Sequence, residues 1–159
     1  MLSLSSGFLP LALASLAVAS QKCKCLPGDA CFPSQQEWDV FATSLSQPLI
    51  SNQRPLASVC YNSSSNFDPL ACAQVTANQF NSFFRVESSN TVQFVDFEDL
   101  ITNNSVQQCP FNPTSGAICQ QGRVPSFSID VRTVSDIQST FNFVSQHNLH
   151  LVVRNTGCV

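Results

Sequence analysis

Eight cysteines constrain this 159-residue chain more than any other feature of its sequence, and all of them lie from Cys23 onward. An even number of cysteines in a secreted chain predicts disulfide bonds rather than thiolate metal sites. Eight cysteines allow on the order of a hundred pairings, so the sequence leaves the connectivity open. Only the loop 109–122 indicates a particular bridge, between Cys109 and Cys119. We expect no metal site.

The N-terminus carries the pattern of a secretory leader. Residues 1–20 have no charged side chain, and residues 8–18 are apolar apart from one proline and one serine. This run is too short to span a bilayer, which needs about 20 apolar residues. It ends in Ala17-Val18-Ala19, a tripeptide typical of signal-peptidase cleavage sites. We therefore predict a signal peptide over 1–19 and a secreted, extracellular chain with no membrane segment; a buried N-terminal helix is the alternative.

Glycosylation sites and charge agree with this compartment. Two sequons, Asn62-Ser63-Ser64 and Asn103-Asn104-Ser105, predict surface loops in a secreted glycoprotein. Charged residues make up 11% of the chain, and the net charge is −3. No cluster of Lys or Arg is present to meet a phosphate backbone, so we expect no nucleic-acid partner.

Two helix starts stand out in the cysteine-rich N-terminal region, which we place at 20–125. Ser34-Gln35-Gln36-Glu37 forms a capping box, and apolar residues follow it at helical spacing, which predicts a helix over 34–45. Asp68-Pro69 matches an N-cap followed by proline at the first helical position, which predicts a second helix over 68–80. Partial alternation over 91–97 indicates a short strand.

The last part of the chain, 126–159, has the clearest periodicity. Alternating apolar residues predict strands over 126–131 and 149–154. Between them, Thr133 and Asp136 form a second capping-box pair, and apolar residues at i, i+4 and i+7 predict a helix that ends near Asn148. The sequence therefore predicts a βαβ unit with parallel strands and a right-handed crossover, within an α+β fold.

The second predicted strand leads directly into Asn155-Thr156-Gly157. Ligands of open α/β sheets gather beyond the carboxyl ends of the strands, and glycine lets backbone amides approach a phosphate closely. A plain turn after a strand also favours Asn and Gly, so this feature alone leaves both interpretations open.

The order of several short motifs resembles one family. These motifs are C-K-C-L-P-G-D-A-C-F-P-S (23–34), E-W (37–38), P-L-A-S-V-C-Y (55–61), C-x-x-x-x-x-x-x-x-x-C-Q-Q-G-x-V-P-S-F-S-I-D-V (109–131), D-I-Q-S-T-F-N-F-V (136–144) and L-H-L-V-V-R-N-T-G (149–157). Together they resemble the fungal secreted branch of the berberine bridge enzyme-like oxidoreductases. Members of that branch carry the FAD-binding fold of the vanillyl-alcohol oxidase and p-cresol methylhydroxylase superfamily.

The resemblance implies a cofactor and a site. FAD would be the cofactor, and Arg154, Asn155, Thr156 and Gly157 would belong to the loop that wraps its pyrophosphate. Cys158 stands where the family has a histidine that commonly bonds to the flavin. The family's remaining flavin domain, substrate domain and catalytic base lie beyond these motifs, so we expect a truncated N-terminal piece, inactive alone and with no catalytic residue of its own. A complete relative would oxidise an alcohol, sugar or related small molecule by hydride transfer to flavin.

The alternative is that the chain is a small secreted disulfide-rich binding or effector protein without enzymatic activity, because many such proteins have eight cysteines. His147 and His150 have no companion ligand or acidic partner nearby in sequence, so we expect structural or solvent-facing roles for them. Four phenylalanines are predicted to belong to the core rather than to a cofactor site: Phe80, Phe83, Phe84 and Phe94.

Overall fold

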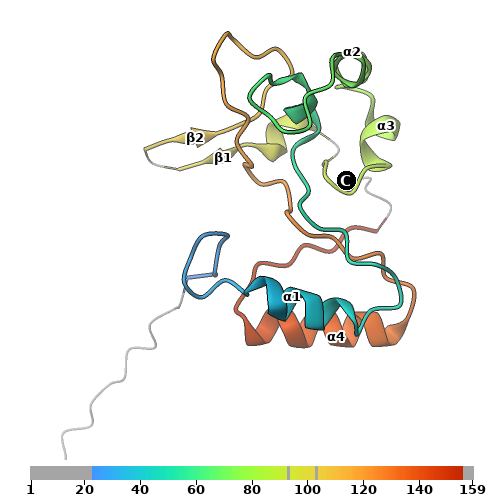
Figure 1. Ribbon diagram of the computed structural model, residues 1–159. Coiled ribbons are helices and arrows are strands. Elements are labelled where there is room, and N and C mark those ends of the chain that lie inside the picture. The colour runs from blue at the N-terminus through green and yellow to red at the C-terminus, as the bar shows by residue number, and fades with distance from the viewer. Residues whose placement is uncertain (1–22, 93, 103, 156–159) are drawn as a thin grey trace, which may run out of the picture.

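The computed structural model describes residues 23–92, 94–102 and 104–155 (Figure 1). The predicted signal peptide, the sequon residue Asn103 and residues 156–159 lie outside this part. The elements in chain order are α1 (Gln35–Ala42), η1 (Leu56–Cys60), α2 (Pro69–Ala77), α3 (Ser82–Val86), η2 (Val95–Glu98), β1 (Leu100–Ile101), β2 (Val106–Gln107) and α4 (Val134–Gln146). The described chain thus combines α-helices and short 3-10 helices with one small antiparallel hairpin, β1–β2.

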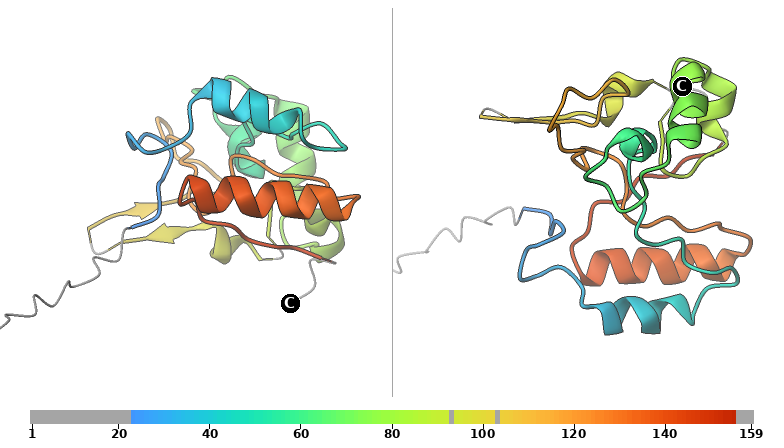
Figure 2. Two further views of the ribbon diagram at one scale, coloured as in Figure 1. Left: turned by 90° about the horizontal axis from the view of Figure 1, so that it is seen from below. Right: turned by 45° about the horizontal axis from the view of Figure 1, so that its top comes forward.

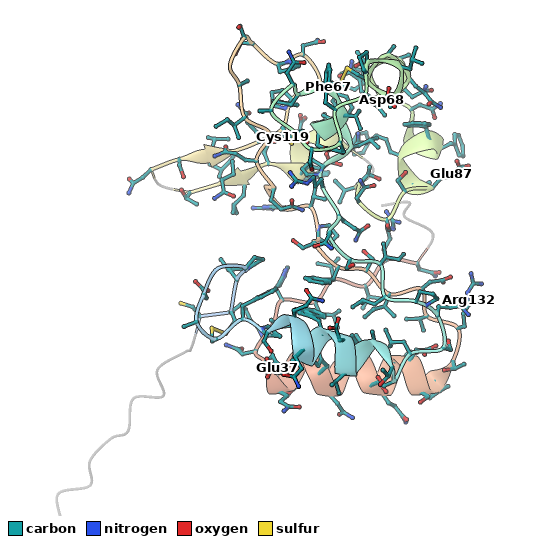
Figure 3. The ribbon with its side chains drawn as sticks, in the orientation of Figure 1. Glu37, Phe67, Asp68, Glu87, Cys119 and Arg132 are labelled. Atoms are coloured by element: carbon teal, nitrogen blue, oxygen red, sulfur yellow. A yellow bond between two sulfur atoms is a disulfide. The ribbon has the colours of Figure 1, made fainter. Side chains whose placement is uncertain are left out.

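Two bodies lie one above the other in Figure 1. The helix layer consists of α1 and α4, which run side by side in both views of Figure 2. The cysteine-rich body consists of η1, α2, α3, η2, the β1–β2 hairpin and the loop 109–124. In Figure 3, Glu37 near the start of α1 and Arg132 just before α4 lie at opposite ends of the layer, so the two helices are antiparallel. Residues 149–155 leave α4 and run back between the two bodies (Figure 1).

Both helices of the helix layer begin at the predicted capping boxes. Ser34 accepts the amide of Glu37, and Thr133 accepts the amide of Asp136, with the reciprocal bond made by each acidic side chain. Such caps satisfy amides that have no partner within a helix, and each contributes about 1 kcal/mol. Local sequence therefore sets where α1 and α4 start.

Aromatic side chains fill the space between α1 and α4. Trp38 and Phe41 of α1 are buried. The Trp38 ring stacks on Phe127 at 3.8 Å between centroids, and the Phe41 ring stacks on Phe143 of α4 at 4.3 Å. Leu149 is buried in the same cluster, so the segment after α4 is anchored to the layer at its first residue.

A buried carboxylate joins the end of the α1 segment to the start of α4. Asp136 accepts the Ser46 amide at 2.8 Å and the Ser46 hydroxyl at 2.7 Å, and it also accepts the amides of Arg132 and Thr133. The hydrogen bonds from Ser46 contribute most to lowering the pKa of Asp136, because donors stabilise the charged carboxylate. The side chain is ionised throughout the neutral range.

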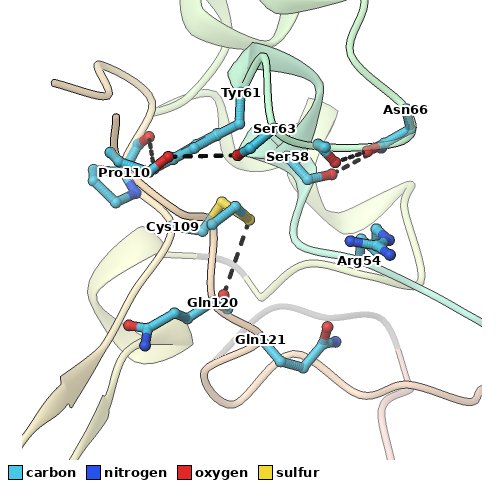
Figure 4. Close-up of a disulfide and its surroundings, with 12 residues drawn as sticks. Arg54, Ser58, Tyr61, Ser63, Asn66, Cys109, Pro110, Gln120 and Gln121 are labelled. Carbon is cyan, nitrogen blue, oxygen red and sulfur yellow. Dashed lines mark hydrogen bonds between the residues drawn. A yellow bond between two sulfur atoms is a disulfide. The ribbon is translucent and has the colours of Figure 1, made fainter. Parts of the chain in front are cut away.

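Disulfides organise the cysteine-rich body and confirm the prediction of a disulfide-bearing chain. Cys60–Cys72 joins η1 to α2, and Cys109–Cys119 closes the loop that the sequence indicated. Figure 4 shows this second bridge beside Tyr61, whose hydroxyl donates to the Pro110 carbonyl at 2.8 Å. A third bridge, Cys25–Cys31, pins the irregular segment before α1.

The structure corrects the predicted helix ends and one strand. The helix predicted over 34–45 ends at Ala42, and the helix predicted over 68–80 ends at Ala77. Residues 91–97 are not a strand, because η2 (Val95–Glu98) occupies the second half of that segment. Weak alternation over a few residues does not distinguish a strand from a tight helical turn.

The predicted phenylalanine core is also wrong in three of its four members. Phe80, Phe83 and Phe94 are more than half exposed, and only Phe84 packs against the core of the cysteine-rich body. That core is made of Ala57, Cys60, Tyr61, Val75 and Phe111. Hydrophobic character alone did not reveal which residues face inward: Phe83 and Phe84 are neighbours in α3, and only Phe84 packs against this core.

The βαβ unit is present only in its helix. Neither 126–131 nor 149–154 forms a strand, and their single ladder contact is an antiparallel bridge between Ser128 and Ile50. Val152 and Val153 are 74% and 78% exposed. A strand is stable only with neighbours that accept and donate its backbone hydrogen bonds, and the described chain supplies none beside 149–154.

Candidate functional site

The structure describes half of the cofactor segment predicted at 154–157. Arg154 and Asn155 are exposed residues at the end of the irregular run that follows α4, and the chain bends at Asn155. Thr156 and Gly157 lie outside the described residues, as does Cys158. No hydrogen bond links the amides of 150–155 to another described residue. Backbone amides without a partner are donors that a phosphate group can use, so the described part of the segment has donors available for an anionic ligand.

The Arg154 side chain points to the cysteine-rich body. Its Nη1 donates to the carbonyls of Ser88 and Thr91, at 2.9 Å each. Both acceptors belong to the turn 88–91 that follows α3. Hydrogen bonds from a charged donor are stronger than neutral ones, so this contact holds the end of the C-terminal segment beside α3.

The turn 88–91 is itself held by several neighbours. Thr91 is 2% exposed, and its hydroxyl donates to the carbonyls of Arg85 and Ser88. The Ser89 hydroxyl donates to the side chain of Gln53. The Asn90 amide group donates to the Arg54 carbonyl at 2.6 Å. The turn therefore meets the C-terminal segment with a fixed shape.

Gln53 extends this network to the other predicted strand. Its side-chain amide donates to the Ser128 hydroxyl at 2.6 Å, and its backbone amide donates to the Ser126 carbonyl at 3.1 Å. Residues 126–128 and the end of 149–155 are thereby linked through Gln53 and the turn 88–91. The N-terminal region thus contributes to the placement of both segments that the sequence predicted as strands.

A buried ion pair underlies the turn. Arg85 is completely buried and pairs with Glu98, and its Nε donates to the Val92 carbonyl at 2.9 Å. The Arg85 guanidinium also lies over the Phe111 ring at 6.0 Å from the centroid. Burial raises the pKa of Glu98, and the Val92 amide and the Arg85 charge oppose that rise. The sequence pattern does not predict this pair, and the one signal for it is a lone arginine within the apolar run of α3.

Gly122 permits the close packing around Glu98. It has φ +57°, and a Cβ at this position would lie 2.2 Å from the Glu98 carbonyl oxygen. The same carbonyl accepts the Arg123 amide at 2.7 Å. Only glycine tolerates both the positive φ and this approach, so the loop that follows the Cys109–Cys119 bridge docks tightly on η2.

Two hollows on the described surface are candidates for a ligand, and neither is lined by Arg154 or Asn155. One, of about 160 Å³, lies between Pro55, Glu98 and Phe111, next to the Cys109–Cys119 bridge. The other, of about 300 Å³, is an open groove between α1 and α4. Pockets that enclose drug-sized ligands are typically about 300–1,000 Å³, and FAD is larger than most such ligands. These hollows therefore do not match a flavin.

The two histidines take the places expected of structural or solvent-facing residues. His147 packs against Phe143 with its ring tilted, at 4.5 Å between centroids, and His150 is exposed. Within the described ranges there is no group of three His, Cys, Asp or Glu side chains that could hold a metal ion. No helix in the described part of the chain is long and apolar enough to cross a membrane.

This chain is similar to known proteins over most of its length. The chain is 36% identical to the FAD-linked oxidoreductase easE of Claviceps fusiformis over 159 residues, covering 93% of this chain and 26% of that protein. It is 37% identical to the FAD-linked oxidoreductase sor8 of Hypocrea jecorina over 140 residues, covering 87% of this chain and 22% of that protein. No family model matches the chain.

The structure is similar to the VAO-type flavoprotein MtVAO615 of Myceliophthora thermophila C1, with a TM-score of 0.71 and 31% identity. That match covers 86% of this chain and 24% of the flavoprotein. By fold, the chain therefore corresponds to part of a VAO-type flavoprotein. By sequence, it is a homologue of FAD-linked oxidoreductases, and it spans about a quarter of the length of the relatives that it matches. The resemblance found in the sequence motifs is confirmed.

Proposed function

We propose that this chain is part of an FAD-binding oxidoreductase that oxidises an alcohol, a sugar or a related small molecule. One observation carries the proposal: the described fold superposes on a VAO-type flavoprotein with a TM-score of 0.71 over 86% of the chain. Sequence identities of 34–37% to several FAD-linked oxidoreductases support it independently. A likeness of fold alone would leave the chemistry open, and the sequence homology narrows it to flavin-dependent oxidation.

Residues 154–157 form the cofactor segment in this proposal. The backbone amides that follow Arg154, which are those of Asn155, Thr156 and Gly157, donate to the pyrophosphate of FAD. Gly157 leaves room for the phosphate oxygens because it has no Cβ. When bound, FAD would supply the hydride acceptor for oxidation of the substrate. The chain's own contribution is to bind and orient one end of the cofactor, and we assign no catalytic residue to it.

We further propose that 126–131 and 149–154 become parallel strands once a longer sheet lies beside them. The exposed valines Val152 and Val153 and the unpartnered amides of this segment support that assignment. Parallel strands are buried on both faces in α/β proteins, and their sequences are rich in Val, Ile and Leu, as 149–154 is. In longer relatives, three quarters of the fold is available to cover them.

Secretion belongs to the same proposal. Three disulfides among the described residues fit an oxidising compartment, in which such bonds form and persist. Asn62 of the first sequon is exposed, so an oligosaccharide can be attached there without disturbing the core. Mass spectrometry of the protein secreted by a eukaryotic host tests both points. It should show a chain that begins at residue 20 and a glycan at Asn62.

A chimera tests the flavin proposal. Residues 23–157 of this chain replace the matched segment of MtVAO615, and the flavin-to-protein ratio of the purified chimera is measured from its absorbance spectrum. We expect a ratio near that of the parent flavoprotein. A matched variant, Gly157→Val in the chimera, should lower the ratio, because its side chain occupies the space of the phosphate oxygens.

A folded chimera without flavin would contradict the proposal and favour a secreted disulfide-rich binding protein. The chain alone should bind FAD with a Kd weaker than about 1 µM, which corresponds to about −8 kcal/mol. The reason is that one short segment supplies few of the donors that such a large cofactor needs. Flavin fluorescence during titration of the purified chain measures this Kd.

A further inference from the structure

The Arg154 side chain has a role in the structure that differs from direct contact with a phosphate. Its Nη1 makes both of its hydrogen bonds, to the Ser88 and Thr91 carbonyls at 2.9 Å each. A guanidinium that binds phosphate typically offers two nitrogens in parallel as a fork. Here one nitrogen instead bridges two carbonyls of the same turn. Arg154 thus bridges the first and last carbonyls of the turn 88–91 from a distant part of the chain.

The turn that receives Arg154 is also held by contacts that do not involve Arg154. Thr91 is almost fully buried, and its hydroxyl bonds to the Arg85 and Ser88 carbonyls. Arg85 in turn is completely buried and paired with Glu98. Because the acceptors are fixed, bonds to them restrict the donor's backbone rather than the turn. The contact therefore transmits the position of the cysteine-rich body to the end of 149–155.

Little else in the described chain holds that end. Leu149 is buried and its amide bonds to the Val144 carbonyl, but Val152, Val153 and Arg154 are exposed and their amides have no partner among the described residues. Four residues of chain thus separate the buried anchor at Leu149 from Arg154, whose side chain makes the next hydrogen bonds of this segment.

We propose that Arg154 is a positioning residue: its guanidinium fastens the end of the segment 149–155 to the turn 88–91, which sets the position of the Asn155 amide, a pyrophosphate donor in the proposed function. The assignment of the ligand rests on the proposed function above; the fastening itself does not. In this arrangement the disulfide-bearing N-terminal region takes part in building the cofactor site, although no side chain of that region touches the cofactor.

Substitution by lysine separates this role from that of a phosphate ligand. One lysine ammonium carries three donors, so it can serve both carbonyls from a single atom, as Nη1 does. It cannot reproduce a planar fork on a phosphate. Arg154→Lys should therefore preserve the fastening, and Arg154→Ala should abolish it. Arg132→Ala is the matched control, because Arg132 is exposed and pairs with Asp130, away from the turn.

The test measures ¹⁵N order parameters of residues 152–155 by NMR on the full chain, without flavin. We expect rigid values, about 0.8, in the wild type, in Arg154→Lys and in Arg132→Ala, and values below about 0.6 in Arg154→Ala. Thr91→Val, which removes the hydroxyl that braces the turn, should lower them as well. Adding Arg154→Ala to Thr91→Val should lower them no further than Arg154→Ala alone. Unchanged order parameters in Arg154→Ala would overturn the proposal.

The flavin-loaded chimera supplies the second readout. Arg154→Lys should keep the FAD affinity within about twofold, and Arg154→Ala should lower it by about tenfold, equivalent to about 1.4 kcal/mol. An equal loss in both variants would mean that the guanidinium fork itself binds phosphate, and the proposal would be wrong. A folded chimera that binds no FAD, with the expected order parameters in the chain, would refute the proposed function and leave the fastening intact.

Discussion

Truncating one phenylalanine of α4 should destabilise the helix layer, whereas truncating another two residues away should not. Phe143 stacks on Phe41 at 4.3 Å and lies 4.8 Å from the Trp38 ring, while Phe141 is 54% exposed. Loss of a fully buried phenylalanine costs about 3–5 kcal/mol, and Phe143 is half-buried, so we expect about 2–4 kcal/mol for Phe143→Ala. Phe141→Ala should stay within about 0.5 kcal/mol.

Trp38 is the only tryptophan in the chain and lies in the helix layer, so its fluorescence reports the unfolding of that layer specifically. With a slope of about 1–3 kcal/mol per molar urea, Phe143→Ala should lower the urea midpoint by roughly 1–2 M. Phe141→Ala should leave it nearly unchanged. Equal shifts in the two variants would refute the assignment of Phe143 to the core and of Phe141 to the exposed face of α4.

Three further outcomes follow from the geometry. The fold lowers the pKa of Asp136 below its ordinary value of 3.8, so the ionised side chain stabilises the fold above pH 3.8 and this stabilisation is lost as the pH falls below that value. Asp136→Asn should remove this part of the acid dependence of stability, which urea titrations at pH 2–6 measure. Gly122→Ala should lower stability by about 1 kcal/mol or more relative to Gly116→Ala, because both glycines have a positive φ but only a Cβ at position 122 would meet the Glu98 carbonyl. Thermal melts compare the two variants, and equal losses of stability would contradict this packing. The chain should self-associate and unfold with poor cooperativity through its exposed C-terminal segment, and Val153→Lys should raise the monomeric fraction in light scattering, whereas a monodisperse wild type with one sharp, reversible transition would refute this expectation.

Features set by neighbouring residues could be predicted from the sequence. Both capping boxes and the Asp68 N-cap depend on side chains within three residues of the amides that they satisfy, and all three were found where the sequence placed them. The Cys109–Cys119 bridge closes a short loop and was also indicated. These elements need no knowledge of the remaining fold.

Features that depend on distant partners could not be predicted in this way. Strands over 126–131 and 149–154 require neighbouring strands, and the pattern of apolar residues says nothing about whether these are present. The burial of Arg85 depends on Glu98, 13 residues later, and on the Val92 carbonyl. Likewise, nothing in the sequence around Arg154 points to a turn more than sixty residues earlier. For the predicted cofactor segment 154–157, the sequence pattern also does not indicate that the Arg154 side chain bonds to this turn.

The crystal structure of the chimera with bound FAD tests the central claim most directly. We predict that the amides of Asn155, Thr156 and Gly157 lie within hydrogen-bond distance, about 2.7–3.2 Å, of the pyrophosphate oxygens. In the same structure, 126–131 and 149–154 should be parallel strands, and the Arg154 side chain should remain on the turn 88–91. A pyrophosphate bound elsewhere, with 154–157 away from the cofactor, would contradict the account.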